Sequence, residues 1–234
     1  MESFGKFLGN TQFGILFITA LIATFYFYKY KHTEMRLFLF LFWYIAINDI
    51  IALEFWDYYG KKYDAIQSNN IFYNILDIVR FSVIIWVIKK SINDPTGLRQ
   101  SIVNKLLYSV WLFYFVNILF INPMVYFLDY AFFFGAIITV IAIMYYSIDL
   151  IKSSQISKIK KDLLLWINIG FLIFNISYPI ILAIQTYYKP LNILEIDEKL
   201  FYTQLPMIVS IISIISNLII IFGFIWSEKR HQHN

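Results

Sequence analysis

Acidic, basic and amide side chains interrupt two consecutive apolar stretches of this chain. They are Asn48, Asp49 and Glu54 in the first stretch and Asn74, Asp77 and Arg80 in the second. A charged side chain at the centre of a bilayer costs about 2.5 to 3.5 kcal/mol, so such residues are usually paired, face the interior of a helix bundle and often serve a function. These residue types can supply an electrostatic anchor, an interhelical ion pair or a proton acceptor.

The composition places these side chains in a membrane protein. Of 234 residues, 60% are hydrophobic and 15% are charged, whereas soluble domains carry about 25% charged residues. The chain contains no cysteine, which excludes a disulfide framework, a thiolate metal site and a cysteine nucleophile. We expect residues 1–234 to form a single membrane domain in contact with the lipid bilayer.

Seven apolar stretches are long enough to cross a hydrocarbon core of about 30 Å. They cover residues 12–30, 37–56, 71–88, 104–121, 124–148, 164–187 and 205–226. The division between the fourth and fifth stretches depends on Asn122 and Pro123, a helix-breaking pair. If this pair only kinks one long helix, the number of spans falls to six. We predict an all-α polytopic membrane protein with seven helices.

Basic side chains gather on one side of this predicted topology. Of 19 Lys and Arg residues, 13 lie after the first, third and fifth spans or in the C-terminal tail, and five lie on the other side. The positive-inside rule therefore places the N-terminus outside and the C-terminus in the cytoplasm. The expected location is the plasma membrane, and the net charge of +4 is explained by topology rather than by a nucleic-acid partner.

The charged residues of the second and third spans are expected to share one layer in the outer half of the membrane. With a rise of about 1.5 Å per residue, Asp49 and Asp77 lie about 10 Å from the outer ends of their spans, and Arg80 about 14 Å. Asn74, Asp77 and Arg80 step by three residues and spread over about 120° of one helix. Such a polar stripe should face protein rather than lipid.

Two interpretations of this layer remain open. In one, Arg80 anchors an anionic ligand group or neutralises Asp49 and Asp77 in an outward-facing pocket. In the other, Arg80 pairs permanently with one carboxylate and holds two helices together. Further polar side chains at similar depth could complete a pocket or form interhelical hydrogen bonds, namely Asn117, Asn175 and Tyr178.

Other features of the later spans have structural or functional interpretations. Pro179 frees the carbonyl of Asn175 and bends the sixth span, either as a fixed bend or as a hinge beside the pocket. Ser210, Ser213 and Asn217 recur at helical spacing and indicate a close-packing face, with a pore lining as the alternative.

Several chemistries lack the residues that they need. The last span contains no lysine for a retinal Schiff base, no histidine lies at membrane depth to bind zinc, and no GxSxG nucleophile motif is present. We therefore expect no enzyme activity, no cofactor and no metal site. Gly is scarce, with 8 residues, which argues against a transporter that needs close helix approach and broken helices.

The run NNIFYNILDIVRF, which follows DYYGKKY, resembles a group of small uncharacterised seven-span bacterial membrane proteins with an acidic second helix. The similarity covers the second and third spans, from Asn48 to Lys90. It supports seven spans and draws attention to Tyr73, Asn74 and Asp77, but it implies no activity or substrate.

The sequence thus leads to a functional hypothesis with two alternatives. We expect a receptor-like or sensory subunit that binds a small ligand, an ion or a proton in an outer pocket and signals to a protein partner at the basic cytoplasmic loops. The pocket residues would be Asp49, Asn74, Asp77, Arg80, Asn117, Asn175 and Tyr178. The alternatives are a small-solute or ion transporter or a membrane-permeabilising channel, and a lipid-modifying enzyme.

Overall fold

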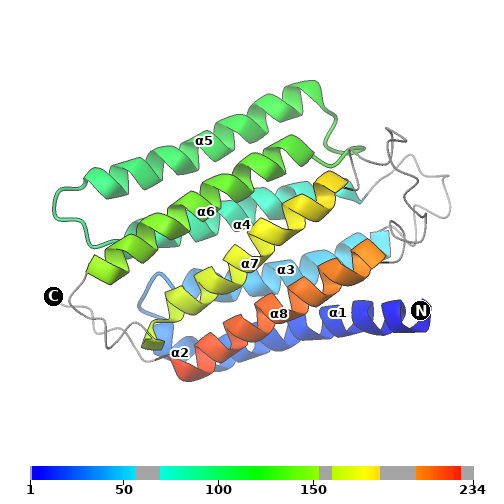
Figure 1. Ribbon diagram of the computed structural model, residues 1–234, viewed down its shortest axis with the longest axis horizontal. Helices are drawn as coiled ribbons and strands as arrows, with labels where there is room; N and C mark the ends of the chain where they lie inside the picture. The colour runs from blue at the N-terminus through cyan, green and yellow to red at the C-terminus, as the bar shows by residue number, and fades with distance from the viewer. Residues whose placement is uncertain (1, 56–68, 153–159, 185–203, 228–234) are drawn as a thin grey trace.

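The computed structural model describes residues 2–55, 69–152, 160–184 and 204–227. This part of the chain forms eight helices (Figure 1). They are α1 (Glu2–Phe25), α2 (Phe27–Tyr30), α3 (Arg36–Phe55), α4 (Asn70–Ser91), α5 (Leu98–Phe120), α6 (Asp129–Lys152), α7 (Leu163–Ala183) and α8 (Leu205–Trp226).

Seven of these helices contain apolar segments of 19 to 23 residues, long enough to cross a membrane. The short helix α2 adds one turn after α1. The prediction of an all-α, multi-pass membrane protein with seven spans is therefore confirmed. The helices alternate in direction, so that α1, α4, α6 and α8 begin at one end of the bundle, which we call the N-terminal end, and α3, α5 and α7 begin at the other (Figure 1).

Three of the helices begin well away from the residues at which they were expected to start. The first span was expected at residues 12–30, but α1 already begins at Glu2 and ends at Phe25. The fifth span was expected from residue 124, but α6 begins at Asp129. Pro123 cannot donate a helical hydrogen bond, and Asn122 turns the chain by accepting hydrogen bonds from Met124 N (3.0 Å) and Tyr126 N (3.0 Å). The intervening loop separates α5 from α6, so the count of seven stands.

The third difference concerns the start of α5, which was expected at residue 104 but lies at Leu98. The carboxylate of Asp94 accepts hydrogen bonds from the backbone N–H groups of Arg99 (2.5 Å) and Gln100 (3.2 Å), and from the hydroxyl of Thr96 (2.7 Å). The hydrogen bond from Thr96, followed by those from the backbone, lowers the pKa of Asp94. Gly97 supplies the turn with a φ of 71°. A polar cap therefore starts the helix before its apolar part begins.

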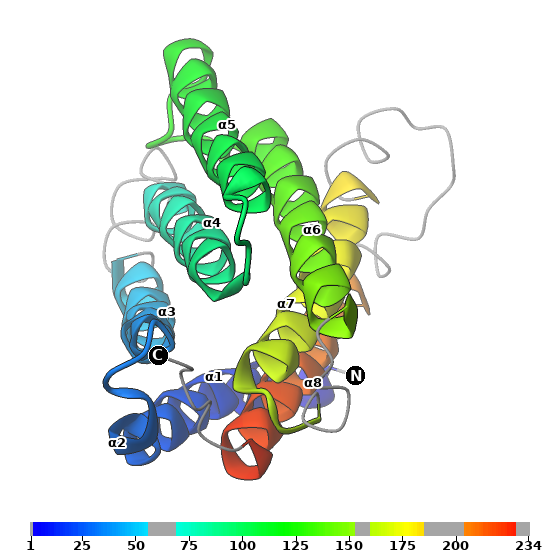
Figure 2. The same cartoon turned by 90° about the vertical axis from the view of Figure 1, so that its left-hand side faces the viewer.

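Six helices form a closed ring, and α5 lies outside it. Each helix of the ring packs against the next in the order α1, α3, α4, α6, α7, α8 and back to α1. Figure 2 shows α5 packed against α4 and α6 on the outer side of the ring. The surface of α5 that faces away from the ring is apolar and lies against lipid, with Leu112, Phe115 and Leu119 each more than half exposed.

Large side chains fill the ring in the half away from the N-terminal end. The ring of Phe171 on α7 stacks against Phe38 and Phe42 of α3, each with centroids 6.3 Å apart, and Phe42 contacts Phe224 of α8 at 6.0 Å. The second half of α4 is likewise buried, including Phe81, Ile84 and Ile88. This core closes the interior of the bundle on the side where the basic residues lie.

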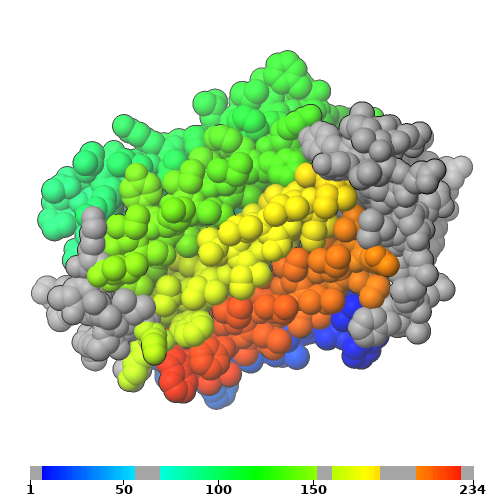
Figure 3. Space-filling model, viewed as in Figure 1, coloured from blue at the N-terminus to red at the C-terminus, as the bar shows by residue number. Residues whose placement is uncertain are grey.

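Close approach of α7 and α8 depends on glycine. Figure 3 shows α6, α7 and α8 side by side across one face of the molecule. A Cβ atom on Gly223 of α8 would lie 2.4 Å from the Cβ of Trp166 on α7, and one on Gly170 would lie 2.8 Å from the backbone oxygen of Ser216. Neither position leaves space for a methyl group without moving a helix.

We predict that Gly223→Ala destabilises the protein by about 1 to 3 kcal/mol, the usual cost of overpacking a dense core. The Cβ of Trp166 cannot rotate away, because it is fixed to the backbone of α7. Thermal unfolding in detergent measures the effect. Gly14→Ala is the matched control, since no atom lies within 4 Å of its Cβ position, and equal stability of the two variants would contradict the prediction.

Candidate functional site: a polar cavity inside the helix ring

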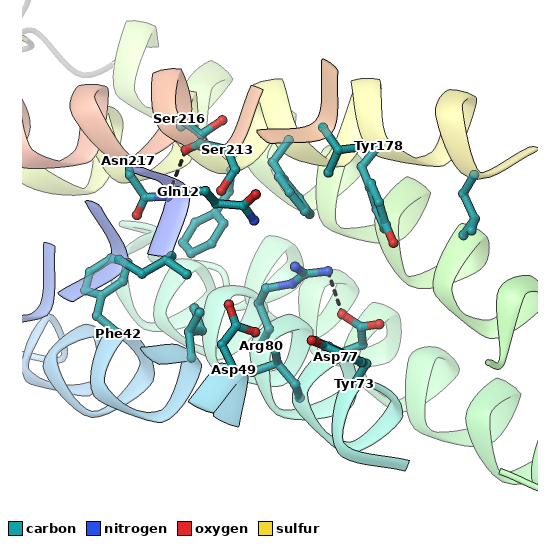
Figure 4. A pocket seen from close by; sticks show the side chains of 18 of the residues that line it. Gln12, Phe42, Asp49, Tyr73, Asp77, Arg80, Tyr178, Ser213, Ser216 and Asn217 are labelled. Carbon is teal, nitrogen blue, oxygen red and sulfur yellow. Dashed lines mark hydrogen bonds and ion pairs between the residues drawn. The ribbon is translucent and has the colours of Figure 1, made fainter. Parts of the chain in front are cut away.

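A cavity of about 430 Å³ lies inside the ring and is lined by α1, α3, α4, α7 and α8. Its polar or charged lining residues are Gln12, Asp49, Asn69, Asn70, Tyr73, Asp77, Arg80, Tyr178, Ser213, Ser216 and Asn217. Its apolar wall includes Phe42, Phe127, Phe171 and Phe174. The close-up in Figure 4 shows Arg80 between Asp49 on one side and Asp77 and Tyr73 on the other.

The cavity occupies the half of the bundle toward the N-terminal end. On α4 its lining runs from Asn70 to Arg80, and on α8 from Val209 to Ile220, which corresponds to about 15 Å along each helix axis. The stacked rings of Phe42 and Phe171 line its deep part and belong to the core beyond it. A charged pocket thus lies above an aromatic floor.

An ion pair between Arg80 and Asp77 lies in the wall of this cavity. Nη2 of Arg80 is 2.7 Å from Oδ1 of Asp77, and both side chains are more than nine-tenths buried. The helical i, i+3 spacing brings the two groups together on one face of α4. The contact lacks the angle of an aligned hydrogen bond, and Nε of Arg80 donates to no residue that the structure describes.

Aromatic rings surround the guanidinium group of Arg80. Its central carbon lies 5.0 Å from the ring centroid of Phe81, 5.1 Å from that of Phe174 and 5.6 Å from that of Phe132. Cation–π attraction of this kind contributes about 0.5 to 2 kcal/mol per contact, with larger values when the groups are desolvated. Three aromatic rings and the carboxylate of Asp77 therefore hold Arg80 in the cavity wall.

Asp49 of α3 faces the same cavity but has no such partner. It lines the cavity, and it forms no ion pair or hydrogen bond with any residue in the described ranges. Phe42, Ile45 and Asp49 share one face of α3 at i, i+3 and i+7 and all contribute to the lining. Glu54 lies further along the same helix and is exposed outside the lining.

Four of the seven predicted site residues line the cavity: Asp49, Asp77, Arg80 and Tyr178. The remaining three, Asn74, Asn117 and Asn175, are buried outside the lining. Asn117 donates to the carbonyl oxygen of Phe113 in its own helix. Both amide atoms of Asn175 are buried without a hydrogen-bond partner among the described residues, one turn before Pro179.

Asn74 secures the loop between α5 and α6. Its Nδ2 donates to the carbonyl oxygens of Pro123 (2.9 Å) and Tyr126 (3.0 Å), and its Oδ1 accepts from the backbone N–H of Leu128 (2.9 Å). Asn70, one turn earlier on α4, donates to the carbonyl of Val125 (2.9 Å). These bonds fix the loop that carries Phe127 into the cavity wall.

The sequence-based site omitted the contributions of α1 and α8. Gln12 is a single amide near the middle of α1, and no pattern in the sequence pairs it with α4. Ser213 and Asn217 were interpreted as a packing face, and α8 does pack through them, since Thr19 Oγ1 of α1 donates to Asn217 Oδ1 (3.0 Å). The same face also lines the cavity. The helical spacing of Ser213 and Asn217 could show that they share one face of α8, but not that this face borders a cavity.

No protein-family model, no curated protein sequence and no solved structure matches this chain. Within the ranges that the structure describes, no three His, Cys, Asp or Glu side chains are grouped as a metal site would require. The site is therefore defined by its own geometry, as a cavity with aromatic rings, an ion pair and one further carboxylate in its wall, inside a multi-pass membrane protein.

We predict that Asn74→Ala destabilises the protein by about 2 to 4 kcal/mol, because it leaves buried backbone groups of the loop without partners at about 1 to 3 kcal/mol each. Thermal unfolding in detergent measures this loss. Asn117→Ala is the matched control, since Asn117 is also buried but bonds only within its own helix. A loss no larger than that of the control would show that the loop does not depend on Asn74.

We predict that Arg80→Met costs about 3 to 5 kcal/mol, because it leaves the carboxylate of Asp77 buried and unpaired. The double variant Arg80→Met with Asp77→Leu should recover most of that loss, since no buried charge remains. Arg99→Met removes the half-exposed partner of Asp149 at the other end of the bundle and should cost about 0 to 1 kcal/mol. A double variant less stable than Arg80→Met alone would contradict the expectation.

Proposed function

We propose that the protein is a receptor-like membrane subunit that binds a small ligand in the cavity and transmits a helix shift to the opposite, basic end of the bundle. The observation that carries this proposal is the cavity itself. Its volume of about 430 Å³ lies in the range of small-molecule sites, about 300 to 1,000 Å³. Its surface is mainly apolar, and polar and charged side chains converge on it, which is also typical of such sites.

The core beneath the cavity favours a receptor over a channel or a transporter. Phe38, Ile84 and Ile88 have no exposed surface, and they fill the ring beyond the cavity floor. A continuous path across the membrane would require this packing to open. A bound ligand, in contrast, contacts the stacked pair Phe42 and Phe171 directly, because both rings line the cavity.

A series of contacts links that floor to the basic end. Phe42 contacts Phe224 of α8, and Phe224 contacts Tyr30 of α2 with ring centroids 6.4 Å apart. The hydroxyl groups of Tyr30 and Ser227 are 2.5 Å apart, and Lys29 donates to the backbone oxygen of Ser227. A change in the packing of Phe42 can therefore shift α8 and α2 together, where the positive-inside rule places the cytoplasm.

The basic end offers a surface for a cytoplasmic partner. Lys29, Arg36, Lys90, Arg99 and Lys160 lie at this end of α2, α3, α4, α5 and α7. By contrast, the charges that line the cavity are internal. We propose that the ligand binds from outside and that the signal is read at this basic end by a protein partner.

The absence of native cysteine allows spin labels to be placed at chosen sites to test this function. We predict that the distance between labels at Lys31→Cys, at the end of α2, and Leu98→Cys, at the start of α5, changes by about 2 Å or more when a small aromatic amine, alcohol or carboxylate binds in proteoliposomes. Leu98→Cys with Ile151→Cys is the control pair, since α5 and α6 lie off the contact series, and it should not change.

The same proteoliposomes distinguish the receptor from its alternative. We expect neither ion flux nor dye leak from the wild-type protein, with or without the compounds. Flux that is lost in folded Arg80→Ala or Asp77→Asn variants would identify a permeation pathway and overturn the receptor proposal. Binding without any change in the label distance would overturn it as well.

A further inference from the structure

We propose that the cavity selects a small organic cation, with Asp49 as the group that binds the positive charge. This inference rests on the proposed ligand-binding function and specifies the class of ligand. It follows from three features of the cavity: the balance of its charges, the state of Arg80 and the chemistry of its wall.

Among the residues that the structure describes, the charges that line the cavity do not cancel. Asp49, Asp77 and Arg80 are its acidic and basic lining residues. Arg80 is paired with Asp77 at 2.7 Å, and this pair is neutral as a unit. Asp49 then remains as a carboxylate without a partner among the described residues. A carboxylate in a low-dielectric interior is costly unless it is neutralised, and a bound monocation would supply the missing charge.

An anionic ligand fits this arrangement poorly, although Arg80 is the residue that first suggests one. The charge of the guanidinium is already balanced by Asp77, and the rings of Phe81, Phe132 and Phe174 surround it, although its Nε and Nη2 have no hydrogen-bond partner among the described residues. A ligand carboxylate placed beside it would form a third negative charge near Asp77 and Asp49. Like charges at short distance in a desolvated site repel strongly. Asp77 and Asp49 therefore disfavour the anionic ligand that Arg80 by itself would attract.

The wall of the cavity suits an amine with an aromatic or aliphatic body. Its lining includes the rings of Phe42, Tyr73, Phe171, Phe174 and Tyr178. Ring faces attract ammonium groups and also pack against apolar carbon. The side chains of Gln12 and Ser213 reach into the same space as Asp49 (Figure 4), and their oxygen atoms can accept further hydrogen bonds from an ammonium group.

The position of Asp49 also explains how such a ligand would act. Asp49 and Phe42 lie on one face of α3, separated by two helical turns, and both border the cavity. A cation held at Asp49 therefore places its body against Phe42 and Phe171, the rings of the cavity floor. Binding of the positive charge by Asp49 and displacement of Phe42 in the cavity floor would then both depend on α3.

The test uses three probes of similar shape and different charge: phenethylamine, 2-phenylethanol and phenylacetate. Their binding to the purified protein in lipid nanodiscs is measured by isothermal titration calorimetry, with empty nanodiscs as the blank. We expect phenethylamine to bind and the other two to bind at least about 10-fold more weakly, since only its ammonium group forms a charge-assisted hydrogen bond with Asp49.

Variants assign the charge to Asp49. Asp49→Asn should weaken phenethylamine binding about 10- to 100-fold, and Asp49→Glu should retain part of it. Glu54→Gln is the matched control, because it removes one carboxylate from the same helix outside the cavity, and it should leave binding unchanged. Melting temperatures of the ligand-free variants verify that each one is folded.

The outcomes separate this inference from the proposed function. Preferential binding of phenylacetate, equal binding of 2-phenylethanol, binding that survives Asp49→Asn, or no binding of phenethylamine would each overturn the cation site. Binding of phenethylamine that depends on Asp49 supports the site. If that binding occurs without a change in the distance between the labels at positions 31 and 98, or with transport into liposomes, the receptor function fails and the cation site stands.

Discussion

The cost of charge inside a membrane is the constraint on which the rest of this structure depends. Arg80 and Asp77 sit on one helix at a spacing that lets them meet before any other helix arrives. The surrounding helices then need only cover a neutral pair, and they do so with aromatic rings from α4, α6 and α7. Asp49 differs, because it has no ion-pair partner among the described residues, and it lines the cavity.

The architecture divides the bundle into two halves with different packing. Near the basic end the ring is filled by Phe38, Phe42, Phe171 and Phe224, and close helix contact is permitted by Gly223. Near the N-terminal end the polar side chains are held apart and leave a cavity. A ligand in the cavity would therefore press on the densely packed half of the bundle. Tightly packed cores shift between discrete arrangements rather than deform continuously.

The sequence was sufficient for the parts of this structure that depend on local chemistry. Apolar length identified seven helices, the Asn122–Pro123 pair separated α5 from α6, and the i, i+3 spacing of Asp77 and Arg80 placed both on one face. It was insufficient where distant helices meet. Asn74 shares the stripe of Asp77 but reaches a loop about 50 residues away, and the periodicity of α4 contains no information about that loop. The roles of Gln12 and α8 depend on ring closure, which hydropathy does not encode.

The closure of the ring between α1 and α8 has a consequence for how the protein is made. Thr19 and Asn217, which bond across this closure, are 198 residues apart in sequence. Because synthesis proceeds from the N-terminus, α1, α3 and α4 enter the bilayer with Asp49 and Arg80 facing a side that α7 and α8 have not yet covered. The ion pair on α4 neutralises Arg80 and Asp77 while the chain grows, whereas Asp49 lacks the cover of α7 and α8 until both helices have been inserted. The cavity can therefore close only after α8 has been synthesised, long after most of its charged side chains have entered the bilayer.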